Sequence, residues 1–422
     1  MVHAKAGRAR RIVVISDFCD GDQPLGEDRS VAHYREDWHA GLRGPAPAER
    51  PVNPPPVLGG YLERLPLAAI RQGLCDAAEI WSFWAREGPP PAPEVDGAIT
   101  RRAFRTQPRI KPSSSNDMLG HLAAFGPPEI LCVWGLGVDE SIMQACQQSI
   151  KVYNSIDAPA LRVPPEVNRH FDLVLTGAEW QSRLVEARHP GMATAVMPIG
   201  PEFASPDTFY PLGLEKPYDV VYVAAAQPYK RHDILFDALA KLPRSICALC
   251  VCGYGELGDD LRARAAKLGI CVDFVGPPGV GYAEVNRLMN LAKIGVVCGV
   301  DDGAPAILTE YMLAGLPVLA NDALTCGLQY ITPLTGRIAN AERFHLGIVD
   351  MLANVGTFRP RHTAILHWGW QATASRFEAL VKAARRTRSE AGCLASRVNL
   401  VTLPPGCPRI ELDSVESRRR WR

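Results

Sequence analysis

Apolar runs of strand length alternate with amphipathic helical stretches along most of this chain. That alternation is typical of parallel sheets covered by helices on both faces, so we predict an α/β fold. A proline-containing stretch at residues 198–217 separates two groups of predicted strands. We therefore expect two doubly wound, Rossmann-like domains.

The first predicted domain covers residues 1–210 and the second covers residues 211–384. The strands predicted for the first domain are 11–16, 79–84, 130–134, 151–154 and 173–176. The second domain has predicted strands at 220–224, 248–252, 272–275, 294–298 and 317–320, with helices at 232–242, 257–268, 282–292 and 306–314. A long final helix is predicted at residues 368–384.

Two segments fall outside this alternation. Residues 20–56 are rich in proline and charge, and we interpret them as an insertion or mobile loop that carries His33 and His39 as surface residues. From Arg385 to residue 422 the sequence has weak periodicity and many Arg, Ser, Pro and Gly residues, so a poorly ordered tail is expected there.

Composition and charge argue against a nucleic-acid-binding protein and against a membrane-spanning one. The chain has 422 residues, of which 47% are hydrophobic and 22% charged, and its formal net charge is +1. A protein that neutralises many phosphates usually has a marked basic excess, so nucleic acid is not an expected partner. No apolar run reaches the length of a membrane span, and the apolar stretch at residues 12–15 is too short for a signal peptide. A cytoplasmic location is therefore expected.

The chain contains 12 cysteines at irregular intervals. In a chain of this size we expect most of them to be reduced thiols in the core. Cys247, Cys250 and Cys252 lie close together in a predicted strand, and no second Cys or His pair follows at zinc spacing. Neither a metal site nor a cofactor is expected.

Candidate chemistry is densest at residues 302–315, where Asp302 and Glu310 lie eight residues apart across a turn. The loop at Gly303, Ala304 and Pro305 leads at Ala306 into a predicted helix that carries Glu310. A helix N-terminus suits an anionic group such as a diphosphate, and carboxylates accept hydrogen bonds from sugar hydroxyls. The alternative is that Asp302 is a helix cap and Glu310 a solvated helix residue.

Three further patterns are candidates for binding. Lys230 and Arg231 follow a predicted strand and precede a helix, which suits phosphate, although they could simply cover the loop. Gly253 and Gly255 also join a strand to a helix, which allows close approach of the backbone to a ligand. The basic segment with Arg101, Arg102, Arg105, Arg109 and Lys111 is either a contact site for anionic lipid or a solvated basic loop.

The segment at residues 296–318 resembles the signature of the retaining nucleotide-sugar glycosyltransferases of family four, which have the GT-B fold. Their pattern is E-G-x-P-x-x-L-x-E-A-M-A-x-G-x-P-V. The residues in register with it are Asp302, Gly303, Pro305, Leu308, Glu310, Met312, Ala314, Gly315, Pro317 and Val318. The first acidic residue is Asp302 here, one methylene shorter than the family Glu.

Other segments extend the resemblance. Lys230 occupies the Lys position of the family's R-x-x-x-x-K motif, and Ala225 occupies the Arg position. Gly253 and Gly255, then Phe274, Val275 and Gly276, resemble the loops that border the nucleotide base. Gly59, Gly60 and Glu63 resemble the glycine loop that faces the donor phosphates, Pro198 and Gly200 resemble the run before the hinge, and Trp370 opens the family's final helix.

The resemblance implies two Rossmann-like domains facing a cleft, with the final helix packing back toward the N-terminal domain. It implies transfer of a sugar from a nucleotide diphospho-sugar, with retained configuration and without a metal, to a glycan, lipid-linked or small-molecule acceptor, as in polysaccharide biosynthesis. Lys230, Arg231 and residues 303–306 would hold the diphosphate, Glu310 the ribose hydroxyls and Asp302 the sugar hydroxyls. A nucleotide-sugar epimerase and a catalytically degenerate nucleotide-sugar binder remain the alternatives.

Overall fold

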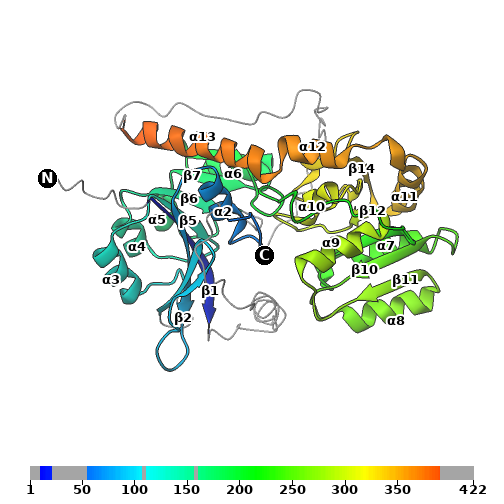
Figure 1. Ribbon diagram of the computed structural model, residues 1–422, viewed down its shortest axis with the longest axis horizontal. Coiled ribbons are helices and arrows are strands. Elements are labelled where there is room, and N and C mark those ends of the chain that lie inside the picture. The colour runs from blue at the N-terminus through cyan, green and yellow to red at the C-terminus, as the bar shows by residue number, and fades with distance from the viewer. Residues whose placement is uncertain (1–9, 21–54, 107–110, 156–159, 390–422) are drawn as a thin grey trace.

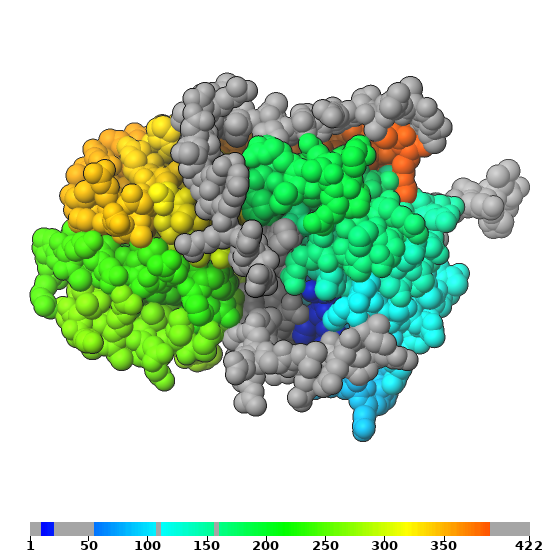
Figure 2. All heavy atoms as spheres, turned by 180° about the vertical axis from the view of Figure 1, so that it is seen from behind, coloured from blue at the N-terminus to red at the C-terminus, as the bar shows by residue number. Residues whose placement is uncertain are grey.

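The computed structural model describes residues 10–20, 55–106, 111–155 and 160–389. Most of the segment interpreted as an insertion, with His33 and His39, lies outside the described residues, as do Arg109 and residues 390–422. The described chain forms two sheets, one of eight strands and one of six. Figure 1 shows each sheet with helices around it, and Figure 2 shows the two groups of residues as two lobes.

The first sheet has the strand order β3-β4-β2-β1-β5-β6-β7-β8. Its strands are β1 (Arg11–Asp20), β2 (Ala77–Trp84), β3 (Glu94–Asp96), β4 (Ile99–Arg105), β5 (Ile130–Trp134), β6 (Ile150–Asn154), β7 (Leu173–Thr176) and β8 (Ala193–Val196). All pairs are parallel except β3 with β4. Every residue of β5 and β6 is buried, as expected for parallel strands covered on both faces.

Helices cover both faces of this sheet. They are α2 (Arg64–Arg71), α3 (Asn116–Phe125), α4 (Glu140–Ala145), α5 (Pro165–Asn168) and α6 (Glu179–Arg188). Side chains cap the starts of α3 and α4, where Ser115 Oγ accepts from the Met118 amide at 3.2 Å and Asp139 Oδ1 accepts from the Ser141 amide at 2.9 Å.

The second sheet has the strand order β11-β10-β9-β12-β13-β14, with all pairs parallel. Its strands are β9 (Tyr218–Val223), β10 (Cys247–Val251), β11 (Cys271–Val275), β12 (Ala292–Val297), β13 (Val318–Asn321) and β14 (Gly336–Ala339). The helices that follow in sequence are α7 (His232–Leu239), α8 (Gly258–Leu268), α9 (Tyr282–Asn290), α10 (Ile307–Leu313), α11 (Phe344–Ala353), α12 (Pro360–His367) and α13 (Trp370–Ser389). The predicted α/β class with two doubly wound sheets is confirmed.

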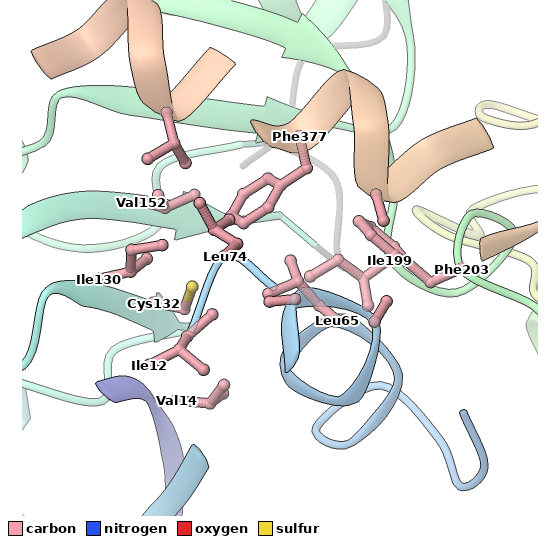
Figure 3. Close-up of a cluster of buried hydrophobic side chains, with 14 of the residues drawn as sticks. Ile12, Val14, Leu65, Leu74, Ile130, Cys132, Val152, Ile199, Phe203 and Phe377 are labelled. Atoms are coloured by element: carbon pink, nitrogen blue, oxygen red, sulfur yellow. The ribbon is translucent and has the colours of Figure 1, made fainter. Parts of the chain in front are cut away.

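The final helix α13 follows the second sheet in sequence but packs on the first (Figure 1). Its buried side chains, among them Trp370 and Phe377, belong to the same core as Ile12, Cys132 and Val152. Figure 3 shows Phe377 reaching from α13 toward Leu74 and the strands below it. The predicted return of the last helix to the N-terminal domain is confirmed.

Helix α13 begins at Trp370, two residues later than predicted, and continues to Ser389, so the expected tail does not begin at Arg385. Arg385 Nη2 binds Glu129 Oε1 at 2.5 Å, and Arg388 Nε binds Asp172 Oδ1 at 2.8 Å. These pairs tie the last turn of the helix to the first domain, which explains why a polar, weakly periodic stretch remains helical.

Two cysteines depart from the expectation of reduced thiols. Cys247 and Cys271 are directly paired in register on β10 and β11, with Cα atoms 4.7 Å apart, and they form a disulfide. The other cysteines of the described residues are buried thiols. The disulfide removes Cys247 from any cluster with Cys250 and Cys252.

The first part of the basic segment, up to Arg105, belongs to strand β4. Two of its arginines pair with carboxylates, since Arg101 Nη2 lies 3.0 Å from Glu63 Oε1 and Arg102 Nε lies 2.6 Å from Glu79 Oε2. The third, Arg105, donates to the Gly88 carbonyl. Lys111 Nζ donates to the Asp17 carbonyl at 2.9 Å. Carboxylates thus neutralise two of the basic side chains, and contact of this segment with anionic lipid stays a prediction.

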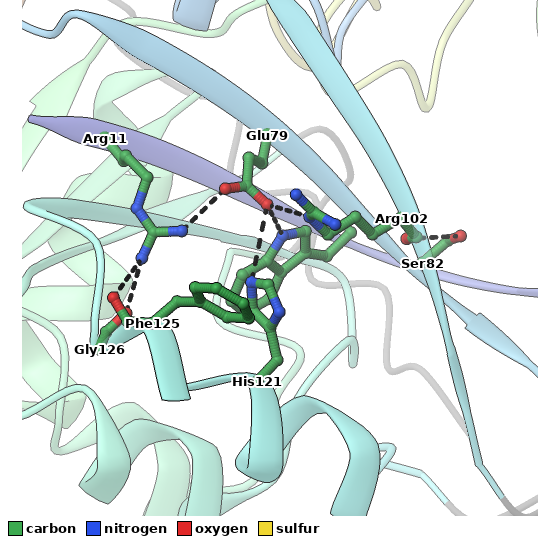
Figure 4. Close-up of polar contacts among 8 residues, drawn as sticks. Arg11, Glu79, Ser82, Arg102, His121, Phe125 and Gly126 are labelled. Atoms are coloured by element: carbon green, nitrogen blue, oxygen red, sulfur yellow. Dashed lines mark hydrogen bonds and ion pairs between the residues drawn. The ribbon is translucent and has the colours of Figure 1, made fainter. Parts of the chain in front are cut away.

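Figure 4 shows the Glu79 network near the amino-terminal ends of β1 and β2. Glu79 also accepts from Arg11 Nη1 at 2.8 Å and from Trp81 Nε1 at 2.9 Å. Burial raises the pKa of Glu79, but the hydrogen bonds from Trp81 and the arginines outweigh it and hold that pKa below its ordinary value. The network lies at the opposite ends of these strands from the site described next.

Candidate functional site

The loops at the carboxyl ends of the second sheet bring together the two charged segments singled out in the sequence. Strand β9 leads into the short 3-10 turn Pro228–Lys230, and Lys230 Nζ forms an ion pair with Asp302 Oδ2. The amide of Val300 donates to the Tyr229 carbonyl at 3.1 Å, which joins the two loops through their backbones as well. Residues 72 positions apart in the chain are thereby placed side by side.

Asp302 is not a helix cap, because α10 begins at Ile307 with Ala306 as its N-cap residue. Between them, Gly303, Ala304 and Pro305 are buried. Tyr311 fixes α10 against β9, since its hydroxyl accepts from the Val223 amide at 2.6 Å and donates to the Val221 carbonyl at 3.2 Å. The helix that carries the acidic motif is thus anchored to the strand that leads to Lys230.

Glu310 lies in the first turn of α10, as predicted, but it is not solvated: only 8% of its surface is exposed. Its Oε1 atom accepts a hydrogen bond from Arg64 Nη2, and Arg64 belongs to α2 of the first domain. Breaking such a buried pair by removing one partner typically costs about 3–5 kcal/mol. The simple interpretations of Asp302 as a cap and Glu310 as a surface residue are therefore both wrong.

Arg64 was not predicted as a site residue. Besides Glu310, its guanidinium binds the Gly59 carbonyl through Nε and the Gly200 carbonyl through Nη1, each at 2.9 Å. Burial lowers the pKa of Arg64, but Glu310 together with Tyr282 and Tyr61 outweighs burial, so the net pKa lies above the ordinary value and the side chain stays charged. The sequence feature that could have identified Arg64 is its position directly after Glu63, in the helix that follows the glycine loop.

The predicted glycine loop lies against the acidic motif. Gly59 has a φ of 87°, in the left-handed region that favours glycine, and the Gly60 amide donates to Glu63 Oε2 at 2.9 Å. The next residue, Tyr61, donates from its hydroxyl to the Ala304 carbonyl at 2.9 Å. The structure therefore brings Gly59 and Gly60 to residues 303–306, as the resemblance implied.

At two further points, a glycine of the first domain lies directly against the backbone of the loop before α10. A Cβ atom on Gly177 would lie 2.2 Å from the Gly303 carbonyl oxygen, and one on Gly200 would lie 2.5 Å from the Ala304 carbonyl oxygen. Thr309 Oγ1 also donates to the Pro201 carbonyl at 2.6 Å. The first domain therefore packs directly against the loop before α10.

Gly253, Gly255 and Val275 lie together at the carboxyl ends of β10 and β11. A Cβ atom on Gly255 would lie 2.4 Å from the Ala226 carbonyl oxygen, and the Cys252 amide donates to the Val275 carbonyl at 2.8 Å. This group borders the loop that carries Lys230, because the Ala226 amide donates to the Tyr254 carbonyl at 2.6 Å.

Arg231 departs from its predicted place beside Lys230. It adopts a left-handed backbone conformation with φ 50° and ψ 47°, and Asp233 accepts from its Nε at 2.9 Å and its Nη2 at 2.8 Å. It lines a groove between α7 and α8 together with Asp260 and Arg264, whereas Lys230 faces Asp302. Adjacent residues at the start of a helix point in different directions, which separates the two cations.

Beneath Lys230 lie two buried residues that sequence reasoning missed. Tyr222 donates from its hydroxyl to the Lys230 carbonyl, and its ring packs on His232 with centroids 4.7 Å apart. Burial and the nearby Lys230 lower the pKa of His232 to about 4, so this imidazole is neutral at pH 7. Ala225, in the position of the family Arg, is also buried and brings no charge.

On the first sheet, two buried polar side chains lie at the carboxyl ends of adjacent strands. Asn154 and Trp134 are partners in the register of β6 and β5. Within the described part of the chain, neither the Asn154 amide nor Trp134 Nε1 has a hydrogen-bond partner. Trp134 packs edge-on against Tyr61, whose hydroxyl binds Ala304. Buried polar groups are usually satisfied, so these two suit a ligand or water.

Comparison with known proteins matches residues 207–336 to the family described as "Glycosyl transferases group 1". Among solved structures, sucrose-phosphate synthase from Thermosynechococcus elongatus is 14% identical with a TM-score of 0.60, covering 90% of this chain and 100% of that one. Anabaena HepE in complex with UDP and glucose is 15% identical with a TM-score of 0.57, covering 89% and 100%. The chain has the GT-B fold.

A third GT-B structure is longer than this chain. The pneumococcal O-GlcNAc transferase GtfA, in complex with UDP and GlcNAc, is 10% identical with a TM-score of 0.51. That match covers 63% of this chain and 59% of GtfA, so this chain spans little more than half of its length. No curated protein matches the chain by sequence.

The family match contains Lys230, Asp302 and Glu310 and ends before α13, while Arg64 and the glycine loop lie in the other domain of the GT-B fold. In the described ranges, no group of three or more His, Cys, Asp or Glu side chains is arranged to hold a metal ion. Nor does any helix of these ranges have the length and apolar character needed to cross a bilayer.

Proposed function

We propose that this protein is a glycosyltransferase that moves a sugar from a nucleotide diphospho-sugar to an acceptor hydroxyl. The observation that carries the proposal is the pairing of Lys230 with Asp302 next to Glu310, within the segment that matches the group 1 family. The site lies where two Rossmann-like sheets meet, and ligands of such sheets bind at the carboxyl ends of the strands.

Lys230 is the proposed contact for the diphosphate. In the structure its charge is balanced by Asp302, so an incoming diphosphate would compete with that carboxylate for the ammonium group. A fixed cation next to the leaving group stabilises negative charge as the glycosidic bond breaks. Asp302, once released, would accept hydrogen bonds from hydroxyls of the transferred sugar.

The remaining donor contacts follow from the neighbouring loops. Glu310 would accept hydrogen bonds from the ribose, and Gly253, Gly255 and Val275 would border the base. Gly303, Ala304, Pro305 and Ala306, with Gly59 and Gly60 opposite them, would enclose the diphosphate. Arg231 is left out of the proposed diphosphate site, because its guanidinium is engaged by Asp233.

The acceptor is proposed to enter from the first sheet. Asn154 and Trp134 offer one uncharged acceptor and two uncharged donor groups there, which suits a hydroxyl-bearing compound such as a glycan. Transfer with retention, and without a metal because Lys230 supplies the positive charge, completes the proposal. UDP is the first nucleotide to try, since HepE and GtfA have been solved with it.

The test is to incubate the protein, in EDTA, with UDP-, GDP- and ADP-sugars, each with and without a panel of glycan acceptors. Release of nucleoside diphosphate that depends on an acceptor would support the transferase. An isomerised donor in the absence of acceptor would show an epimerase instead. Binding without turnover would show a degenerate binder, a result that Ala225 in place of the family Arg would explain.

A further inference from the structure

Arg64 joins three segments that are far apart in the chain. Its side chain is 4% exposed, and its nitrogens reach the Gly59 loop, the Gly200 loop and Glu310 on α10. Two of these partners belong to the first domain and the third, 246 residues away, belongs to the second.

We propose that Arg64 is a positioning residue of the donor site, which orients the Glu310 carboxylate from the opposite domain so that Glu310 recognises the ribose hydroxyls. This inference rests on the proposed function. Arg64 donates a hydrogen bond to Glu310 Oε1, so Oε2 remains to accept a hydrogen bond from the nucleotide-sugar donor. A carboxylate has two oxygens and about four lone-pair sites, so both contacts are compatible.

The bonding of the guanidinium explains why arginine suits this position. Nε and Nη1 each bind a backbone carbonyl at 2.9 Å, and these two bonds fix the plane of the group. Nη2 then has one direction, toward Glu310. A lysine carries the same charge but lacks the rigid fork, so it cannot reproduce all three bonds at once.

The two carbonyls are themselves held in place. Gly59 needs its left-handed backbone, and a Cβ on Gly200 would collide with the Ala304 carbonyl oxygen at 2.5 Å. Both loops also contact the acidic motif directly, through Tyr61 and through Gly200. Arg64 is therefore anchored to segments that touch the motif only when the domains are together.

Two consequences follow for the donor site. Without Arg64, the Glu310 carboxylate would be buried without its counter-ion and free to change rotamer, so it would lose its preference for vicinal hydroxyls. Ribose recognition would also depend on contact between the domains, because the orienting group comes from the first domain and the carboxylate from the second. Nucleotide binding and domain closure would then favour one another.

The experiment compares the affinity of each variant for UDP, GDP and ADP with its affinity for the matching 2′-deoxynucleotide, by isothermal titration calorimetry. The variants are Arg64→Met, Arg64→Lys and Glu310→Gln. The matched control is Arg11→Met, which breaks the pair of Arg11 with Glu79, 2.8 Å apart on strands β1 and β2 of the first domain, where both side chains are largely buried. A purely structural arginine would alter stability without altering the ribose-to-deoxyribose ratio.

For the wild type we expect about tenfold or more preference for the ribonucleotide that binds, the effect of a hydrogen bond to a charged group. Arg64→Met and Glu310→Gln should bring the ratio close to one, and Arg64→Lys should reduce it at least about threefold. Arg11→Met should unfold at a lower temperature and keep the wild-type ratio. If Arg64→Met does not fold, the ratio of Arg64→Lys decides.

Three results would overturn the inference. A ratio unchanged in the Arg64 variants would make Arg64 a structural residue. A wild type that binds nucleotides but does not distinguish the deoxynucleotide would remove Glu310 from the ribose, and the proposed transferase would stand. A wild type that binds none of the three nucleotides would remove both proposals together.

Discussion

Asp302 and Glu310 lie eight residues apart on one loop and one helix, yet their partners come from different domains. Asp302 pairs with Lys230 of its own domain, and this ion pair survives if the domains separate. Glu310 pairs with Arg64 of the other domain, so it loses its counter-ion on opening. On the proposed function, one acidic motif would thus serve two purposes, a charge site that belongs to one domain and an oriented carboxylate that requires both.

Some of the proposed donor contacts need the second domain alone, whereas others need the second domain in contact with the first. Contacts to a diphosphate and a sugar would be present in either arrangement. Recognition of the ribose, and exclusion of water from the reacting bond, would need the closed one. Substitutions on each side of the cleft should therefore have distinguishable effects on turnover and on donor affinity.

The largest effect on activity is expected for Lys230→Ala. Loss of a charge-assisted bond of about 1.5–3 kcal/mol should lower turnover about ten- to hundredfold in a steady-state transfer assay. The matched control is Lys293→Ala, which breaks the pair of Lys293 with Asp219 on the same sheet and should leave turnover unchanged. Similar turnover in both variants would remove Lys230 from the mechanism.

Gly177→Ala tests the need for contact between the domains. The added Cβ would meet the Gly303 carbonyl oxygen at 2.2 Å and should hold the domains apart, lowering kcat/KM by about tenfold. Small-angle X-ray scattering should show a larger radius of gyration than for wild type. Gly120→Ala, in a helix with open space around it, is the control, and equal activity of the two variants would contradict the closed arrangement.

Arg231→Ala should have a smaller effect. The guanidinium is 41% exposed and already paired with Asp233, an interaction of about 0–1 kcal/mol, so turnover should fall by less than about fivefold. The same assay used for Lys230→Ala provides the measurement. A loss as large as that of Lys230→Ala would place Arg231 on the diphosphate and show that its pairing with Asp233 is broken during turnover.

The smallest effect on the site is expected from Glu79→Gln, which acts only on the stability of the first domain. Because the pKa of Glu79 is lowered in the folded state, its charge stabilises the fold above the ordinary glutamate pKa of 4.5 and ceases to do so as pH falls through the lowered value. Urea unfolding should show the variant about 1–3 kcal/mol less stable at pH 7, with the difference shrinking in acid. A change in nucleotide affinity would contradict a purely structural role.

Much of the fold was predictable because buried parallel strands are continuous apolar runs, as in β5 and β6. Strand β4 was missed because its sequence, I-T-R-R-A-F-R, is mostly polar. Two of its arginines are accommodated by Glu63 and Glu79, which are 38 and 23 residues away. The local sequence cannot show that charges are paired by residues so far away in the chain. The end of α13 was missed for the same reason, because Glu129 and Asp172 pair with its last arginines.

The candidate site likewise contains residues that could be predicted from the sequence and residues that could not. Lys230, Asp302 and Glu310 were predictable because each lies at a loop or helix start within a recognisable spacing. Arg64 was not, because its significance depends on Glu310, 246 residues further along the chain. The separation of Arg231 from Lys230 was also hidden, because it depends on a left-handed backbone at a single residue.

The most direct test of the central claim is thermal unfolding of the wild type and Lys230→Ala with UDP, GDP, ADP and their common sugar conjugates in EDTA. A ligand at about a hundredfold its Kd adds roughly 2.7 kcal/mol of stability. The account predicts that one nucleotide raises the Tm of the wild type selectively and that Lys230→Ala loses much of that shift. No shift with any nucleotide, or the same shift in both proteins, would contradict a donor site at Lys230 and Asp302.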